Sequence, residues 1–358
     1  MILSTALAAG PGGSAALAFN TYPAPAITVA GGNSVIAVQT SEDGLRFYWN
    51  QYGTNNWYGE QVAANGTTYS PPTMVQDGNA VIIAAVGPKD SLDFYWAQNG
   101  TSDWNAETVA GAWSTYSAPS MAVDGDTVNI AAEGPNNSLT FYWAFNGSPT
   151  WGPETVAGPG TTYSAPSLAV NGGGVNIAAE GPANSLDFYW AFNGSSSWGP
   201  EAVAGPGTTF SAPAITGNDG YANIAAEGPG SSLDFYWQQN GTTPWHPEPV
   251  PGTSGAVDSA PAIVAFNTLD LPYVAVPFQA GPEDSIVNPM QAQGDSTWEL
   301  QVVNVALPPW LIAASPVSVT VNNGTENIAS FGVSGQLWFY WFGTGAWHQE
   351  LVAPGGAN

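Results

Sequence analysis

The chain has 358 residues, of which 44% are hydrophobic and only 8% are charged. Its 27 acidic residues are matched by two basic ones, Arg46 and Lys89, which gives a formal net charge of -25. This charge repels nucleic-acid phosphates and anionic lipid, no apolar run approaches the roughly 18 residues that cross a bilayer, and the lack of Cys excludes disulfides and thiol chemistry.

A tripeptide, Phe-Tyr-Trp, recurs along the chain and marks a repeated unit. It starts at positions 47, 94, 141, 188 and 235, always 47 residues apart, and again at position 339. The last interval is about twice as long, and the degenerate copy Asn288-Pro289-Met290 lies within it. The chain therefore contains seven units, with anchors near residues 47, 94, 141, 188, 235, 288 and 339.

Each unit shows the pattern of four short strands joined by turns. In the unit that begins at Tyr163, residues 165–170, 175–179, 186–192 and 198–204 are predicted strands, and Asn193-Gly194 is a hairpin signal. Seven such units predict an all-β fold, a seven-bladed β-propeller of four-stranded antiparallel blades that forms a single domain over residues 1–358. Residues 1–20 precede the first unit and could add a closing strand.

The third predicted strand of each unit carries the aromatic residues. Its residues alternate between two sides, with Phe188 and Trp190 on one and Asp187 and Tyr189 on the other. Because neighbouring blades cover both sides of a propeller sheet, packing between blades is favoured over ligand contact for these rings.

A glutamate and an aromatic residue recur in the loops at one end of the predicted strands, and both residue types can contact a sugar. A carboxylate can accept hydrogen bonds from hydroxyl groups, and an aromatic ring can stack on the C–H face. A glutamate that caps its own turn beside a packed aromatic ring is the equally open alternative. The candidate carbohydrate-binding residues are Glu133, Glu180, Glu227, Tyr69, Tyr116, Tyr163 and Phe210.

A second row of acids lies three residues after the fourth-strand Trp in six of the seven units, at Glu60, Glu107, Glu154, Glu201, Glu248 and Glu350. The fourth strand is the outer edge of a blade, and a charge there discourages edge-to-edge association, so protection of the edge is the favoured interpretation.

Little in the sequence favours catalysis or a metal. The only histidines, His246 and His348, both follow a fourth-strand Trp, which favours a surface strand position over a catalytic base. Asp124 and Asp126 flank a glycine and could bind Ca²⁺, but the sister repeat lacks them, so a solvated turn is favoured. We expect no catalytic residues and no cofactor.

The repeat is similar to that of a known family. Ser-Ala-Pro, then Glu-Gly-Pro-x-Asn-Ser-Leu, an aromatic pair and Asn-Gly-x-x-x-Trp resemble the PLL-type bacterial seven-bladed propeller lectins, and more distantly the tectonin and fungal fucose-lectin propellers. The resemblance covers Tyr22 to Val352 and implies sugar binding. Fungal fucose sites use an Arg in each pocket, whereas this chain has only Arg46.

These observations predict a secreted, non-enzymatic, multivalent lectin whose partners are glycans, with its best sites in blades 3 and 4 and none in blade 6. One alternative is a structural or protein-interaction propeller of a secreted assembly. Another is a secreted glycoside hydrolase or lyase with single acids in the central channel.

Overall fold

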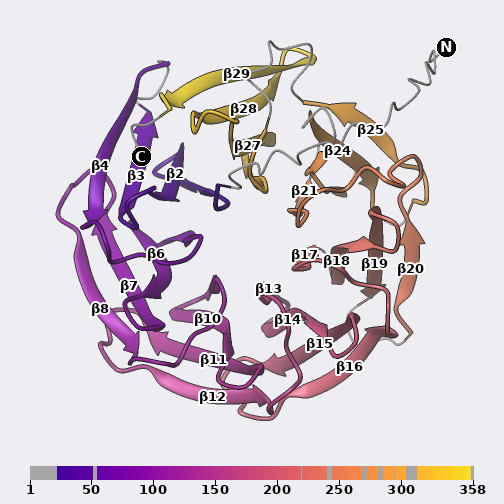
Figure 1. Ribbon diagram of the computed structural model, residues 1–358, viewed down its shortest axis with the longest axis horizontal. Coiled ribbons are helices and arrows are strands. Elements are labelled where there is room, and N and C mark those ends of the chain that lie inside the picture. Colours follow the sequence, from indigo (N-terminus) through magenta and orange to yellow (C-terminus); the bar gives the residue numbers. More distant parts are fainter. Residues whose placement is uncertain are drawn as a thin grey trace, which may run out of the picture.

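The computed structural model describes residues 22–50, 55–218, 220–239, 244–267, 272–280, 285–293, 295–303 and 313–355. These residues form seven antiparallel sheets that stand as blades around a central axis (Figure 1). The predicted seven-bladed propeller is confirmed, and the described residues contain no helix that could span a membrane. The extra strand expected within residues 1–20 lies outside the described residues.

Consecutive strands build each blade. Blade 1 has β1 (Ala26–Ala30), β2 (Asn33–Gln39), β3 (Leu45–Asn50) and β4 (Trp57–Ala63). Blade 2 has β5 (Thr73–Asp77), β6 (Ala80–Gly87), β7 (Ser91–Gln98) and β8 (Asn105–Ala110). Blade 3 has β9 (Ser120–Asp124), β10 (Thr127–Gly134), β11 (Ser138–Phe145) and β12 (Gly152–Ala157). Blade 4 has β13 (Ser167–Asn171), β14 (Gly174–Gly181), β15 (Ser185–Phe192) and β16 (Gly199–Ala204).

Blade 5 has β17 (Ala214–Asn218), β18 (Tyr221–Gly228), β19 (Ser232–Gln239) and β20 (His246–Pro249). Blade 6 has β21 (Val264–Asn267), β22 (Pro272–Ala275), β23 (Phe278–Ala280), β24 (Ser285–Ala292) and β25 (Glu299–Val302). Blade 7 has β26 (Ser318–Asn322), β27 (Thr325–Phe331), β28 (Leu337–Gly343) and β29 (Ala346–Ala353). The first strand of a blade is innermost and the last is outermost (Figure 1).

Blade 6 departs from the predicted four strands because its second strand is divided. The segments β22 and β23 both pair with β24, and Val276 and Pro277 separate them. Proline has no backbone N–H to donate to a neighbouring strand, so regular pairing stops there.

The core consists of layers between neighbouring blades. Between blades 3 and 4, Phe141 packs with Val175 and Tyr189 in one buried cluster, and its ring centroid lies 5.0 Å from that of Trp198. Equivalent pairs occur at other boundaries, such as Phe188 with Trp245 at 5.0 Å. The expected packing of the third-strand Phe between blades is confirmed.

The Glu-Gly-Pro loops are shaped by close contacts within the blade. The backbone N–H of Glu180 donates to Ser164 Oγ of the Ser-Ala-Pro segment at 3.3 Å. A Cβ added to Gly181 would lie 2.0 Å from Asp187 Oδ2, so any other residue would require Asp187 to shift. Burial raises the pKa of the Asp187 carboxyl above its ordinary value.

Blades 7 and 1 close the ring through side-chain packing. Trp57 Nε1 donates to Glu350 Oε2 at 2.9 Å, and the Ile27 backbone N–H donates to Ser318 Oγ at 3.2 Å. Ile36 and Phe339 belong to one buried cluster across the same boundary. Among the described residues, no blade borrows a strand from another part of the chain.

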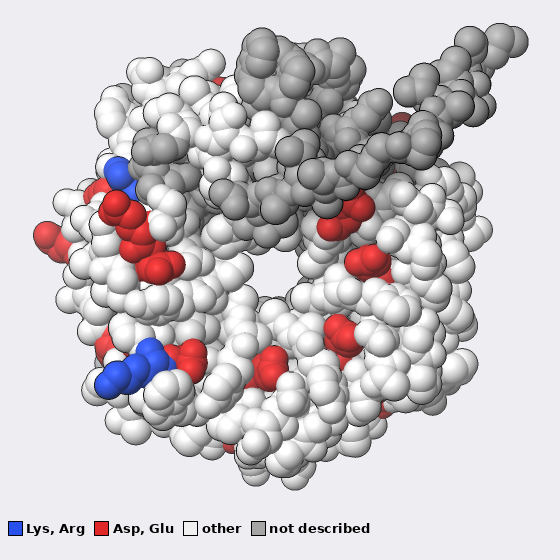
Figure 2. Space-filling view, in the orientation of Figure 1, with Lys and Arg blue, Asp and Glu red and all other residues white. Residues whose placement is uncertain are grey.

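The innermost strands surround a central channel of about 360 Å³. Its walls carry the Ala-Pro pairs that precede the first strands, such as Ala165-Pro166 and Ala212-Pro213, together with Ser, Thr, Met, Ile and Val residues. Figure 2 shows one face of the ring, on which acidic side chains form separate groups around the central opening instead of one patch.

Candidate functional site between neighbouring blades

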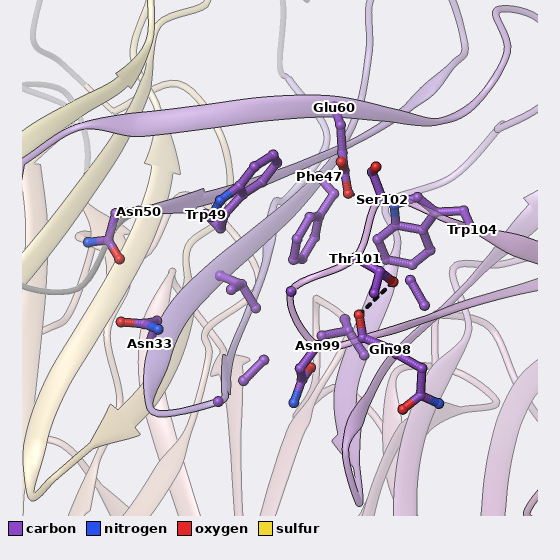
Figure 3. A pocket seen from close by; sticks show the side chains of 16 residues that line it. Asn33, Phe47, Trp49, Asn50, Glu60, Gln98, Asn99, Thr101, Ser102 and Trp104 are labelled. Atoms are coloured by element: carbon purple, nitrogen blue, oxygen red, sulfur yellow. Dashed lines mark hydrogen bonds between the residues drawn. The ribbon is translucent and has the colours of Figure 1, made fainter.

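Pockets open between neighbouring blades at four boundaries, and we name each by the blades that form it. Pockets 1/2, 2/3, 3/4 and 4/5 have volumes of about 470, 570, 410 and 380 Å³. Such volumes are typical of small-molecule sites. Figure 3 shows pocket 1/2, with the outer strand above it and the hairpin Gln98–Ser102 of blade 2 at one side.

The same side chains recur in each pocket because each unit has the same strand pattern. A blade contributes the Phe and Trp of its third strand and the Glu of its fourth, and the next blade contributes the Trp immediately before its fourth strand. In pocket 1/2 they are Phe47, Trp49, Glu60 and Trp104 (Figure 3). The equivalent residues are Phe94, Trp96, Glu107 and Trp151 in pocket 2/3; Phe141, Trp143, Glu154 and Trp198 in pocket 3/4; and Phe188, Trp190 and Glu201 in pocket 4/5.

The fourth-strand glutamates connect blades. Trp104 Nε1 of blade 2 donates to Glu60 Oε1 of blade 1 at 2.7 Å. The corresponding distances are 2.8 Å for Trp151 and Glu107, 3.2 Å for Trp198 and Glu154, 3.2 Å for Trp245 and Glu201, 2.8 Å for Trp298 and Glu248, and 2.9 Å for Trp57 and Glu350. At the blade 6–7 boundary Gln301 Oε1 accepts from Trp347 at 3.1 Å. The structure thus gives these acids a bonding role that edge protection did not anticipate.

The pockets differ in how many oxygens of the fourth-strand Glu accept a hydrogen bond from the protein. Glu154 also accepts from Trp143 of its own blade at 2.9 Å, and Glu201 accepts from Trp190 at 3.0 Å, so both oxygens of each are bonded. Glu60 and Glu107 accept one indole N–H each through Oε1. Pockets 1/2 and 2/3 therefore keep a carboxylate oxygen for a ligand.

The residue opposite the third-strand Trp explains this difference. Gly199 stands opposite Trp190, and a Cβ there would lie 2.7 Å from the indole, so glycine lets the ring lie across the fourth strand towards Glu201. In blade 1, Tyr58 holds that position and stacks on Trp49 with 5.9 Å between ring centroids.

The structure also places each predicted loop aromatic residue next to the loop position that carries Glu133, Glu180 or Glu227, or Val86 in blade 2. The backbone N–H of Tyr163 donates to the Glu180 carbonyl at 2.9 Å. Tyr116 with Glu133 and Phe210 with Glu227 pair at 2.9 Å, and Tyr69 pairs with Val86 at 2.8 Å. These aromatic side chains are 46–49% exposed.

The loop glutamates cap their own turns. Glu180 Oε1 accepts from Asn184 Nδ2 at 2.8 Å, and Glu133 and Glu227 bond the equivalent Asn137 and Ser231. Burial raises the pKa of all three carboxyls above the ordinary value. A role of these loops in sugar binding remains a prediction.

Sequence reasoning did not identify the pockets, although the signal was present. The loop residues lie on turns between second and third strands and between blades, whereas the pockets adjoin the hairpins at the opposite ends of the strands. The available pattern was the Glu that follows the fourth-strand Trp at a constant spacing in six units, each of which also carries a Trp in its anchor on the neighbouring third strand.

The remaining candidates have structural partners. Asp124 Oδ2 accepts from Asn193 Nδ2 of blade 4 at 2.8 Å, and the described part of the chain contains no group of three or more metal-binding His or acidic side chains. His246 and His348 are exposed on fourth strands, as predicted, and stack on Trp237 and Trp341 at 4.2 and 5.2 Å.

No family model and no curated protein sequence matches the chain. Its structure is similar to the BP39L lectin of Burkholderia pseudomallei, with a TM-score of 0.80 and 16% identity over 93% of this chain and 99% of that one. AofleA from Arthrobotrys oligospora aligns with a TM-score of 0.57 and 15% identity over 94% and 88%. The six-bladed Aleuria aurantia lectin aligns with 0.56 and 12% over 80% and 96%. The chain therefore shares the propeller fold of these lectins.

Proposed function

We propose that this protein is a multivalent lectin that binds neutral glycans in the pockets between its blades. The observation that carries the proposal is the recurrence of one set of lining residues, two indoles and a carboxylate, in pockets 1/2, 2/3 and 3/4, with one indole and the carboxylate again in pocket 4/5. Repetition of weak sites around one ring favours binding to surfaces that present many copies of a sugar.

The chemistry of the pocket suits a pyranose ring. Indole faces stack on the apolar C–H side of a sugar, and a carboxylate accepts charge-assisted hydrogen bonds from hydroxyl groups. Because the chain carries 27 acids and two bases, a sugar with a carboxylate or sulfate would be repelled.

Neighbouring folds support the sugar class without fixing the sugar. The Aleuria aurantia lectin was solved with α-methyl-L-fucoside and with Fucα1-6GlcNAc, and SapL1 with α-methyl fucoside. The Arg of fungal fucose sites has no counterpart in the four pockets, because Arg46 lines none of them and lies over the Tyr48 ring of its own strand at 5.6 Å.

We also propose that this lectin is secreted and is not an enzyme. A hydrolase would require acids that face a shared substrate channel. The described walls of the central channel carry apolar and hydroxyl side chains and no carboxylate.

The proposal can be tested by glycan-array binding followed by two matched variants. Glu60→Gln with Glu107→Gln removes the charge from pockets 1/2 and 2/3, and Gln301 shows that glutamine can keep the indole bond. We expect the affinity for the bound glycan to fall about tenfold or more per altered site, the usual effect of a charged hydrogen bond.

The second variant, Glu180→Gln with Tyr163→Ala, alters a loop pair on the other side of the ring and serves as control. If it lowers glycan affinity while the pocket variant does not, the predicted loop residues are the binding site. If the wild-type protein retains no glycan on the array, the lectin proposal is wrong.

A further inference from the structure

Two of the pockets are closed at one side by a hydrogen bond between blades. The hairpin that joins the third and fourth strands carries an Asn, and in blade 3 Asn146 Nδ2 donates to Asp77 Oδ1 of blade 2 at 2.8 Å. In blade 4 Asn193 donates to Asp124 of blade 3 at the same distance. These bonds fix the hairpins of pockets 2/3 and 3/4 to the preceding blade and occupy the amide.

Pocket 1/2 lacks this bond. Its hairpin carries the equivalent Asn99, but the last residue of β1 is Ala30, where β5 and β9 end in Asp77 and Asp124. Asn99 Nδ2 and Oδ1 are both shut off from water, and neither has a hydrogen-bond partner among the residues that the structure describes. Asn99 lines the pocket on the side away from Glu60 (Figure 3).

A buried amide without hydrogen-bond partners is energetically unfavourable. A ligand that bonds the Asn99 amide therefore gains more binding free energy than one that must first displace the partner of an amide already bonded. Rotation of the Asn99 side chain into the pocket that it lines breaks no hydrogen bond. Asn146 would first have to leave a carboxylate, which is a strong partner.

We propose that Asn99 is a specificity-determining residue that hydrogen-bonds the ligand in pocket 1/2, an inference that rests on the proposed lectin function. A primary amide presents one acceptor and one donor side by side, which matches two adjacent hydroxyl groups of a pyranose. The unused Oε2 of Glu60 accepts from a further hydroxyl on the opposite side. Pocket 1/2 therefore selects a neutral pyranose with a vicinal diol, and it does so more stringently than pocket 2/3.

The test follows the indole N–H signals of Trp104 and Trp151 by NMR, because their bonds to Glu60 and Glu107 make them separate reporters of pockets 1/2 and 2/3. The probes are methyl α-L-fucoside, methyl α-D-mannoside and methyl β-D-galactoside, each with its 3-deoxy analogue, which has no vicinal diol. We expect the Trp104 signal to titrate with an intact glycoside and to lose about tenfold in affinity with its 3-deoxy form.

Three variants complete the experiment. Asn99→Ala removes the amide, and Ala30→Asp supplies the missing partner; each should raise the dissociation constant reported by Trp104 about tenfold while leaving Trp151 unchanged. Asp77→Ala releases Asn146 and should change only the Trp151 titration. Ala30 is buried, so Ala30→Asp could fail to fold; in that case the titration of Asn99→Ala is sufficient to test the role of Asn99.

The outcomes separate the two proposals. If Trp104 titrates equally in the wild type and in Asn99→Ala, or if only Trp151 titrates, the role of Asn99 is wrong and the lectin function stands. If no glycoside moves either signal and the array is also negative, both proposals fail.

Discussion

At the scale of single residues, the repeat contains a glycine whose position is too crowded for a larger side chain. The glycine of each Glu-Gly-Pro loop lies against two third-strand side chains of its own blade, a Ser together with an Asp in blades 4 and 5 and with Thr140 in blade 3. For Gly181, a Cβ would meet Asp187 Oδ2 at 2.0 Å and Ser185 Oγ at 2.4 Å. Asp187 is half-buried, so it has limited room to move away from an added side chain.

We therefore expect Gly181→Ala to lower the free energy of unfolding by about 1–3 kcal/mol, the usual range for overpacking. Gly205→Ala is the matched control, because nothing lies within 4 Å of its added Cβ. It should leave stability within about 0.5 kcal/mol of the wild type. Urea denaturation of both variants measures the difference, and equal values would contradict the steric explanation.

At the scale of blades, the boundary between blades 6 and 7 replaces an apolar contact with a polar one. At the three boundaries between blades 1 and 4 a third-strand Phe packs with a second-strand Val, as Phe141 does with Val175. Here Asn288 and Glu326 hold those positions, both buried, with Asn288 Nδ2 donating to Glu326 Oε2 at 2.6 Å. Within the described part of the chain, Asn288 Oδ1 and Glu326 Oε1 have no hydrogen-bond partner, and a protonated Glu326 carboxyl would be able to donate a hydrogen bond as well as accept one.

Burial raises the pKa of Glu326 to about 7, against an ordinary value of 4.5. The folded state then binds a proton that the unfolded state releases, so this stabilisation is present at low pH and is lost as the pH rises through about 7. We expect it to contribute on the order of 3 kcal/mol between about pH 8 and pH 4.5.

Glu326→Gln should remove this part of the pH dependence, because its amide can donate to and accept from Asn288 at every pH. The free energy of unfolding, measured by denaturant titration across that pH range, should be higher for the variant than for the wild type at pH 8. The same slope in both proteins would show that Glu326 is ionised throughout.

At the scale of the whole molecule, the dominant feature is an excess of unpaired negative charge. Two bases cannot neutralise 27 acids, and burial raises the pKa of Asp93, Asp187, Asp234, Glu133, Glu180 and Glu227. Raised acid pKa values mean that the folded protein takes up protons before the unfolded chain does as the pH falls.

The melting temperature should therefore rise between pH 7 and about pH 5, and added NaCl should raise it at pH 7 by screening repulsion. The four conditions, two pH values each at low and high salt, can be compared by calorimetry. A protein that is less stable at pH 5 and indifferent to salt would indicate that its carboxylates are individually stabilised by hydrogen bonds.

The fold was predictable because it depends on local patterns repeated seven times. The strand signals, the turns and the Phe-Tyr-Trp anchors each lie within one unit, and β13 to β16 agree with the predicted strands of that unit to within three residues. Even blade 6, whose anchor is Asn288-Pro289-Met290, could be placed by its distance from the neighbouring anchors.

The pockets could not be predicted from the sequence in the same way, because the residues of each pocket come from two blades. Glu60 and Trp104 are 44 residues apart and meet only when blade 2 stands beside blade 1. Whether Glu154 has one indole partner or two depends on the space that Gly152 leaves beside Trp143. The repeated blade follows from the amino-acid pattern alone, since its signals act over a few residues. Which side chains face each other across a boundary depends on the folded ring, because the angle and register between blades follow from packing of all seven blades.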